Sequence, residues 1–160
     1  MNHKPKPILI LGVGNILLTD EGFGVHVIEH LRSIPLPDDV ELFDGGTAGA
    51  DLIDVLADRR KVIIIDTVQS DQPPGTILKF KIDDLLPQHE GIMSMHNLGI
   101  PETLTMTKLL ACHPAEVIFI AIKPGYISCG LTLTKHISDQ IPKTIQLILN
   151  ELHSNQPNSV

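Results

Sequence analysis

The chain of 160 residues is long enough to fold as one domain with a real hydrophobic core. Its 19 acidic and 12 basic residues give a net charge of -7, which argues against binding a nucleic-acid backbone. The apolar runs fall far short of the ~20 residues that cross a bilayer, and the polar, proline-containing start is unlike a signal peptide. We therefore expect a cytoplasmic protein with neither nucleic acid nor membrane as partner, in which Cys112 and Cys129 are reduced thiols.

Short runs of branched apolar residues predict the strands. Residues 7–12, 61–66 and 116–122 are apolar on both faces, which is typical of buried parallel strands. Residues 40–43 form a weaker run. The alternating pattern of residues 76–80 favours a half-exposed strand or an antiparallel edge.

Helical periodicity appears between these runs. Residues 22–32 and 49–57 each place their apolar side chains on one face. Residues 101–111 open with a proline at a suitable first helical position. In residues 132–152, Pro142 interrupts the pattern, which predicts either a kinked helix or two helices.

The alternation of strands and helices predicts an α/β fold. We expect a single-domain, three-layer fold with a mainly parallel twisted sheet and helices on both faces. The domain should span residues 1–153, and residues 154–160 read as a polar C-terminal tail.

Two local patterns resemble known sites but fit them poorly. Gly12 and Gly14 follow the first strand as in a dinucleotide-binding turn, but Leu17 stands where that fingerprint needs its third glycine. His26, Glu29 and His30 spell the H-x-x-E-H pattern of inverted zincins. Because both histidines fall off the apolar face of their helix, we interpret them as solvated surface residues.

Acidic residues follow three of the predicted strands. Asp20 and Glu21 come after the first, Asp44 after the second, and Asp66 directly after the third. Since ligands of open α/β sheets bind at the carboxyl ends of the strands, these carboxylates should converge on one edge. Carboxylates gathered without a basic partner repel one another, and a metal ion relieves that repulsion. The alternative is capping of a turn, which suits Asp44 better than Asp66.

His96 is a further candidate ligand because it lies in a loop before a predicted helix. Two carboxylates and one imidazole suit Ni²⁺, Zn²⁺ or Mn²⁺ rather than copper(I) or an iron–sulfur cluster. The residues alone therefore indicate a metal-binding α/β domain and leave its activity open: a non-catalytic binding protein and a zinc protease built on His26 and His30 remain alternatives.

Five blocks together resemble the hydrogenase-maturation endopeptidases, which process the large subunits of nickel–iron hydrogenases. The blocks are residues 10–25 (ILGVGNILLTDEGFGV), 44–47 (DGGT), 65–66 (ID) with 74–76 (PGT), 94–99 (SMHNLG), and 122–124 (IKP) onward to 130–132 (GLT). The first block is highly specific, and the match covers nearly the whole chain. One departure is Ser128, which stands where the family often has glutamate.

The resemblance implies a site and a reaction. Its metal ligands map to Glu21, Asp66 and His96, and Glu21 is preferred to Asp20 because the family pattern allows either acid there. The implied enzyme is an aspartate/metal-type endopeptidase that removes a short C-terminal extension from the nickel-loaded large-subunit precursor. The nickel arrives with the substrate, so the free enzyme needs no resident metal.

We expect the second block to bind substrate. A Gly-Gly turn lets another backbone approach closely, so Asp44, Gly45 and Gly46 should line the substrate cleft. The protein is expected to act as a monomer.

Overall fold

The computed structural model describes residues 4–85, 93–94 and 99–154. Their sheet has the strand order β2-β1-β3-β6-β4, with β5 paired to the end of β3. The β1–β2, β1–β3 and β3–β6 pairs are parallel, whereas β4 is an antiparallel edge strand. The strands are β1 (Ile8–Val13), β2 (Val40–Gly46), β3 (Lys61–Gln69), β4 (Ile77–Lys81), β5 (Met93–Ser94) and β6 (Val117–Ile122). The predicted mainly parallel sheet is confirmed.

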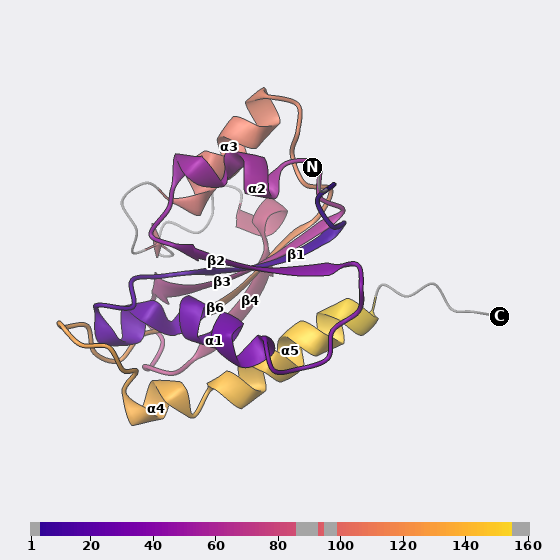
Figure 1. Ribbon diagram of the computed structural model, residues 1–160. Coiled ribbons are helices and arrows are strands. Elements are labelled where there is room, and N and C mark those ends of the chain that lie inside the picture. Colours follow the sequence, from indigo (N-terminus) through magenta and orange to yellow (C-terminus); the bar gives the residue numbers. More distant parts are fainter. Residues whose placement is uncertain (1–3, 86–92, 95–98, 155–160) are drawn as a thin grey trace.

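Helices cover both faces of the sheet, as predicted. Helices α1, α4 and α5 lie on one face, and α2 and α3 lie on the other (Figure 1). The helices are η1 (Thr19–Gly22), α1 (Phe23–Leu31), η2 (Ala50–Leu52), α2 (Ile53–Leu56), η3 (Ile82–Leu85), α3 (Ile100–Leu109), α4 (Lys135–Ser138) and α5 (Ile141–His153). No helix in these described ranges has both the length and the apolar character needed to cross a bilayer.

Two prolines mark helix starts, as their missing N–H predicts. A proline stands in the first turn of α3 and another in that of α5. Pro142 therefore does not kink one long helix. It begins α5 after a break that separates this helix from α4, which decides between the two alternatives left open by the sequence.

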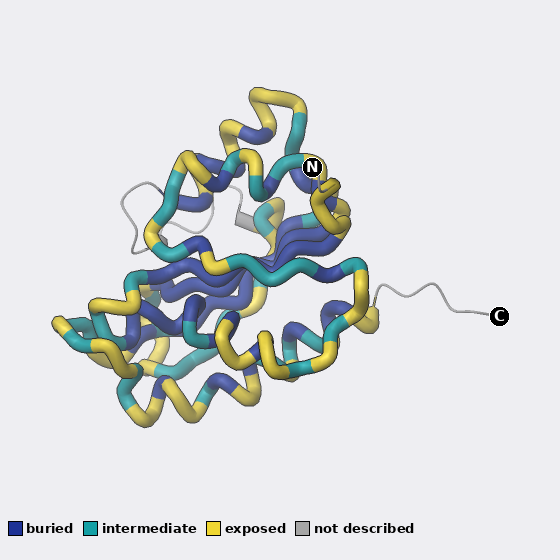
Figure 2. The backbone as a smooth tube through the Cα atoms, viewed as in Figure 1, coloured by how far each residue is buried: buried dark blue, intermediate teal, exposed yellow. Residues whose placement is uncertain are grey.

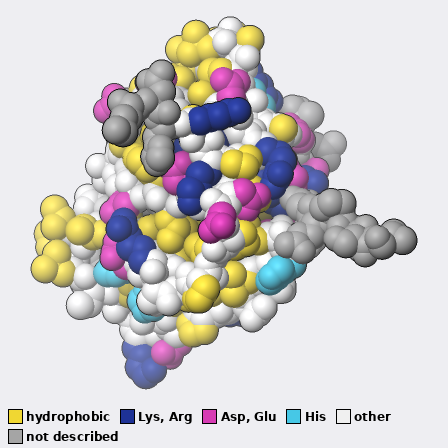
Figure 3. Space-filling view, turned by 45° about the vertical axis from the view of Figure 1, so that its right-hand side comes forward, with side chains coloured by type: hydrophobic (Ala, Val, Ile, Leu, Met, Phe, Trp, Pro, Cys, Tyr) yellow, Lys and Arg dark blue, Asp and Glu magenta, His cyan; other side chains and the backbone are white. Residues whose placement is uncertain are grey.

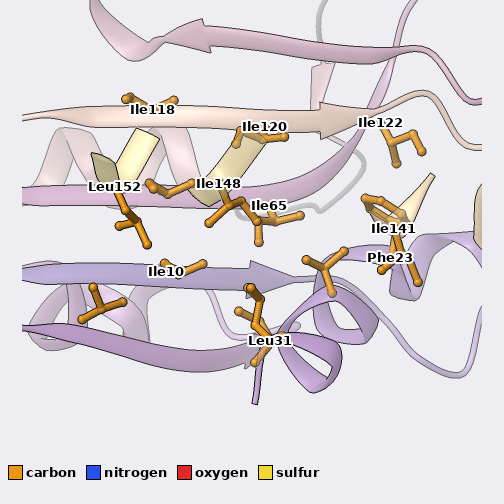
Figure 4. Packing of buried hydrophobic residues seen from close by; sticks show 14 of the residues in the cluster. Ile10, Phe23, Leu31, Ile65, Ile118, Ile120, Ile122, Ile141, Ile148 and Leu152 are labelled. Atoms are coloured by element: carbon orange, nitrogen blue, oxygen red, sulfur yellow. The ribbon is translucent and has the colours of Figure 1, made fainter. Parts of the chain in front are cut away.

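Alternation along the strands divides the apolar core into two layers. In β1, Ile8 and Ile10 pack with α1 and α5, whereas Leu9 and Leu11 pack with residues of α2 and α3. The first layer is shown in Figure 4, where isoleucines of three strands meet α1 and α5. The central strands are buried along their length (Figure 2), which explains why they are apolar on both faces.

The third strand is longer than the sequence predicted. β3 continues past Asp66 to Gln69, because Thr67 pairs with Ile122 of β6 and Val68 pairs with Ser94 of β5. The prediction that this strand ends on Asp66 was therefore wrong. Its apolar run stops there, but hydrogen bonding to two neighbours carries the strand onward.

Buried ion pairs fasten α5 to the edge of the sheet at which the parallel strands begin. The Lys61 ammonium is buried and donates to a carboxylate oxygen of Glu151 at 2.9 Å and to its carbonyl oxygen at 3.0 Å. Lys79 also pairs with Glu151, and Glu116 lies 3.9 Å from the Lys61 nitrogen. Burial acts to raise the pKa of Glu151, but hydrogen bonds from Lys79 and Lys61 outweigh it and hold that pKa below its usual value.

We predict that Glu151→Gln lowers the free energy of unfolding by about 3 kcal/mol, because it leaves the buried Lys61 ammonium without its closest charge. The control is Asp139→Asn, since the Lys135–Asp139 pair is exposed and should be worth less than about 1 kcal/mol. Urea unfolding at neutral pH measures both. Equal losses from the two variants would contradict the prediction.

The Glu151 contribution should also depend on pH. A depressed folded-state pKa gives stability that is present above the unfolded pKa of about 4.3 and is lost as the pH falls through the folded value. The difference between wild type and Glu151→Gln should therefore shrink on acidification below that pH.

Candidate active site

The parallel arrangement places the predicted acidic residues on one edge. In the register of the sheet, Gly12 of β1 pairs with Asp44 of β2 on one side and with Ile65 of β3 on the other. Asp66, the next residue, lies just beyond the last paired residue of β1. The carboxyl ends of three adjacent strands therefore bring Asp44 and Asp66 to the rim where ligands of such sheets bind.

Close backbone approach brings Glu21 to the same rim. A Cβ atom on Gly14, whose φ is +152°, would lie 2.1 Å from the carbonyl oxygen of Glu21. A Cβ on Gly24 would lie 2.3 Å from the carbonyl oxygen of Ile65. Only glycine fits at either position. The glycines of the first block thus allow η1 and the start of α1 to pack directly against β1 and β3. This packing accounts for the glycines without a phosphate-binding role.

Two carboxylates at this rim are largely withdrawn from solvent. Glu21 is 6% exposed and Asp66 is 1% exposed. An Asp66 carboxylate oxygen accepts a hydrogen bond from the backbone N–H of Thr67 at 2.7 Å, and η1 packs against β3. Buried carboxylates are costly unless paired, hydrogen-bonded or bound to a cation, so these two side chains are the strongest candidates for chemistry at the rim.

Asp20 has a different task from its neighbour Glu21. Its carboxylate is fully buried and accepts hydrogen bonds from the backbone N–H groups of Gly125 (3.1 Å), Tyr126 (2.8 Å) and Thr134 (2.7 Å). The Thr134 hydroxyl donates a fourth, at 3.0 Å. These bonds fasten η1 to the loop between β6 and α4, and the choice of Glu21 as the ligand stays a prediction.

The second block borders a cleft of about 280 Å³ beside this rim. Asp44, Gly46 and Thr47 line one side of it, and Asn15, Ile16 and Leu17 contribute from the loop after β1. Gly45 does not line the cleft, because it is buried and a Cβ there would lie 2.8 Å from a Leu11 methyl group. The Asp44 carboxylate accepts a hydrogen bond from the Gly46 N–H at 2.9 Å, so the predicted turn capping is also present.

His96 lies outside the described residues, so the geometry of the full predicted ligand set stays a prediction. Across residues 4–85, 93–94 and 99–154, no group of three His, Cys, Asp or Glu side chains is arranged to hold a metal ion. Glu21 and Asp66 are thus brought to one rim without a third ligand from the described part of the chain.

The histidines of the H-x-x-E-H pattern differ from one another. His30 is exposed and bonds through Nδ1 to the carbonyl oxygen of His26, 2.8 Å away within the same helix. His26 is half-buried, and its Nε2 atom is inaccessible to solvent. Burial, and then the charge of His30, lower the pKa of His26. The interpretation of both as fully solvated was therefore wrong for His26.

Two other parts of the rim are hard to identify from the sequence. The role of Asp20 was missed because its partners are backbone groups more than 100 residues away. The loop of residues 124–134 was recognised only through the family resemblance. Its lack of charged residues, visible in the sequence, is the signal that could have identified it as a surface of unusual composition.

The chain is similar to known proteins over most of its length. A family model described as hydrogenase maturation protease matches residues 25–151. A putative hydrogenase maturation protease of Methanocaldococcus jannaschii is 33% identical over 93% of this chain and 98% of its own length. The hydrogenase 2 maturation protease of Escherichia coli is 34% identical over 91% of this chain and 90% of its own.

Solved structures show the same fold. The hydrogenase-maturating endopeptidase HybD from Escherichia coli superimposes with a TM-score of 0.84 at 34% identity, covering 92% of each chain. A [NiFe] hydrogenase maturation protease from Thermococcus kodakarensis superimposes with a TM-score of 0.75 at 23% identity, which shows likeness of fold alone.

We predict that Asp20→Asn lowers the free energy of unfolding by about 3 kcal/mol, because an amide nitrogen would face backbone donors that a charged carboxylate now satisfies. Asp44→Asn is the matched control: Asp44 is exposed and accepts one bond that asparagine can also accept, so its effect should stay within about 0.5 kcal/mol. Chemical denaturation compares the two. Wild-type stability in Asp20→Asn would remove Asp20 from its fastening role.

Proposed function

Because this chain belongs to the hydrogenase maturation proteases, we propose that it matures a nickel–iron hydrogenase by cutting the C-terminal extension from the large-subunit precursor. The observation that carries the proposal is the burial of two carboxylates, Glu21 and Asp66, at the carboxyl edge of parallel strands. Such a pair, in a protein whose relatives are named for this processing, is suited to recognising a metal-loaded substrate.

In this proposal Glu21, Asp66 and His96 contact the nickel that the precursor already carries. Two carboxylates and an imidazole are ligands of the type that Ni²⁺ accepts. The nickel is part of the substrate, so cleavage depends on its prior insertion, and the free enzyme needs no metal of its own. The imidazole supplies selectivity, because two carboxylates alone would also suit Mg²⁺ or Ca²⁺.

Hydrolysis needs water to add to the scissile carbonyl carbon, after which the C–N bond breaks and the leaving amine takes a proton. The substrate's nickel can orient the precursor and polarise that carbonyl. A carboxylate at the rim can accept the proton of the attacking water. The buried positions of Glu21 and Asp66 favour such roles, because charge interactions are stronger where water is excluded.

The extension itself is proposed to enter the cleft beside the rim. Gly46 and Asp44 border this cleft, and the absence of a side chain on Gly46 leaves room for an extended peptide backbone. Gly45 packs against Leu11 of β1 and so holds the turn against the sheet.

The direct test incubates the purified protein with a large-subunit precursor in nickel-loaded and nickel-free forms. The loaded form should shorten, seen as a gel shift and as the loss of the extension by mass spectrometry, while the nickel-free form stays intact. Equal cleavage of both forms would refute recognition through nickel, and cleavage of neither would refute the proposed activity.

We predict that His96→Ala abolishes processing, with a fall in activity far larger than any change in melting temperature. The sequence predicts a loop at His96, and substitutions in surface loops usually change stability by about 0.5 kcal/mol or less. This substitution also removes the only nitrogen ligand of the proposed set. Glu21→Gln should behave alike, because it keeps the shape of the side chain and loses its charge. Cleavage of loaded precursor is measured beside thermal melting, and wild-type cleavage by folded His96→Ala would exclude His96 from the site.

A second prediction separates this site from a zinc protease. His26→Ala combined with His30→Ala should leave processing nearly intact, because neither histidine belongs to the proposed set of nickel contacts, and His30 is exposed and bonds to a carbonyl oxygen of its own helix. The same samples are assayed for zinc by elemental analysis. Loss of activity in a folded double variant, together with stoichiometric zinc in the wild type, would favour the zincin alternative.

A further inference from the structure

Two loops that are far apart in the sequence lie side by side at the rim. The loop after β1 and the loop between β6 and α4 are joined by backbone hydrogen bonds, from the Thr19 N–H to the Gly130 carbonyl and from the Gly130 N–H to the Leu17 carbonyl, both 2.9 Å. Leu18 and Gly130 form a parallel bridge. In Figure 1 the second loop is the orange segment beside the start of α1.

These loops expose a group of large apolar side chains, which we call the apolar lip: Ile16, Leu17, Tyr126 and Leu131. Their exposed fractions lie between 44% and 66%. Residues 12–19 and 124–134 contain no charged residue, although charged residues make up 19% of the chain. Figure 3 shows hydrophobic side chains projecting together at the left-hand edge of the molecule. Exposed apolar groups gathered in this way mark interaction surfaces.

The lip is held in a fixed shape by groups beneath it. Asp20 binds the N–H groups of Gly125 and Tyr126, and the Thr19 hydroxyl donates to the Tyr126 carbonyl at 2.7 Å. The Ser128 N–H donates to the same hydroxyl at 3.1 Å. A surface whose backbone is already ordered loses little entropy on binding a partner.

The position of the lip indicates its occupant. Ile16 and Leu17 belong both to the lip and to the wall of the cleft that Asp44 and Gly46 complete. A molecule seated on the lip would therefore also cover the cleft. A second copy of this chain in that place would block the cleft, whereas the substrate must occupy both.

We infer that the apolar lip docks an uncharged, apolar surface of the large-subunit precursor next to its C-terminal extension. This inference rests on the proposed function and adds a second contact with the substrate. The carboxylates contact the nickel, and the lip binds the protein surface around it. Because residues 12–19 and 124–134 carry no charge, the affinity of the lip should change little with ionic strength, unlike docking steered by the net charge of -7.

The test introduces a charge into the lip and into an equally exposed apolar position elsewhere. Leu131→Lys and Tyr126→Lys alter the lip, and Leu109→Lys at the end of α3 is the matched control, since Leu109 is 75% exposed. Cleavage of nickel-loaded precursor is followed at increasing precursor concentration. Binding to immobilised loaded precursor is measured in parallel at low and high salt.

The lip variants should raise KM and Kd by about tenfold or more, as expected for truncation of an interface hot spot, with kcat changed less than about twofold. Leu109→Lys should match the wild type in all three quantities. Unchanged or lowered KM in both lip variants overturns the inference, as does a wild-type dimer in sedimentation analysis that Leu131→Lys dissociates, because that result assigns the lip to a second copy.

Failure of the proposed function gives a different result from failure of this inference. Wild-type protein that binds loaded precursor without cutting it refutes the proposed cleavage, and the binding assay still compares the lip variants. Wild-type protein that neither binds nor cuts refutes both.

Discussion

The arrangement of side chains at the carboxyl edge of the sheet depends on the close approach of the η1–α1 backbone to strands β1 and β3. η1 and the start of α1 rest directly on β1 and β3, at distances that leave no room for a Cβ on Gly14 or Gly24. A side chain at either position would push the helix away from the sheet. Glu21 lies between these two glycines in the sequence, so the same close packing decides whether its carboxylate reaches the rim where Asp66 lies.

Asp20 and Glu21 are adjacent in the sequence but differ in their surroundings. Asp20 is satisfied by three backbone N–H groups and one hydroxyl, all from one loop, and a carboxylate so fully engaged is poorly suited to exchange partners during a reaction. Glu21 follows it and is held in place by this anchoring. The loop of residues 124–134 supplies every one of these hydrogen bonds, so the order of that loop and the position of Glu21 are coupled.

Local pattern predicted the layers of this fold better than it predicted the details of its rim. The apolar runs of β1, β3 and β6, and the helix starts at Pro101 and Pro142, follow from properties of single residues and their neighbours, so they are readable from the sequence. The continuation of β3 past Asp66 depends on pairing with β5 and β6, which no local pattern contains. The ends of the predicted strands indicated the acidic candidates, and family resemblance selected Glu21, Asp66 and His96 among them. The partners of Asp20 are too distant in sequence for spacing to reveal.

Charged side chains are distributed unequally between the amino-terminal and carboxyl edges of the sheet. At the amino-terminal edge, Lys61, Glu151 and their neighbours form a buried network that fastens α5 and faces no cleft used by the proposed reaction. At the carboxyl edge, the uncharged residues 12–19 and 124–134 lie beside a small number of buried carboxylates. Most of this border is uncharged, and the ammonium of Lys123, which follows β6, donates to the side-chain oxygen of Gln69 at 2.6 Å. In the proposed function, the nickel that the substrate carries meets Glu21 and Asp66 at this mostly uncharged edge, where their burial strengthens charge interactions.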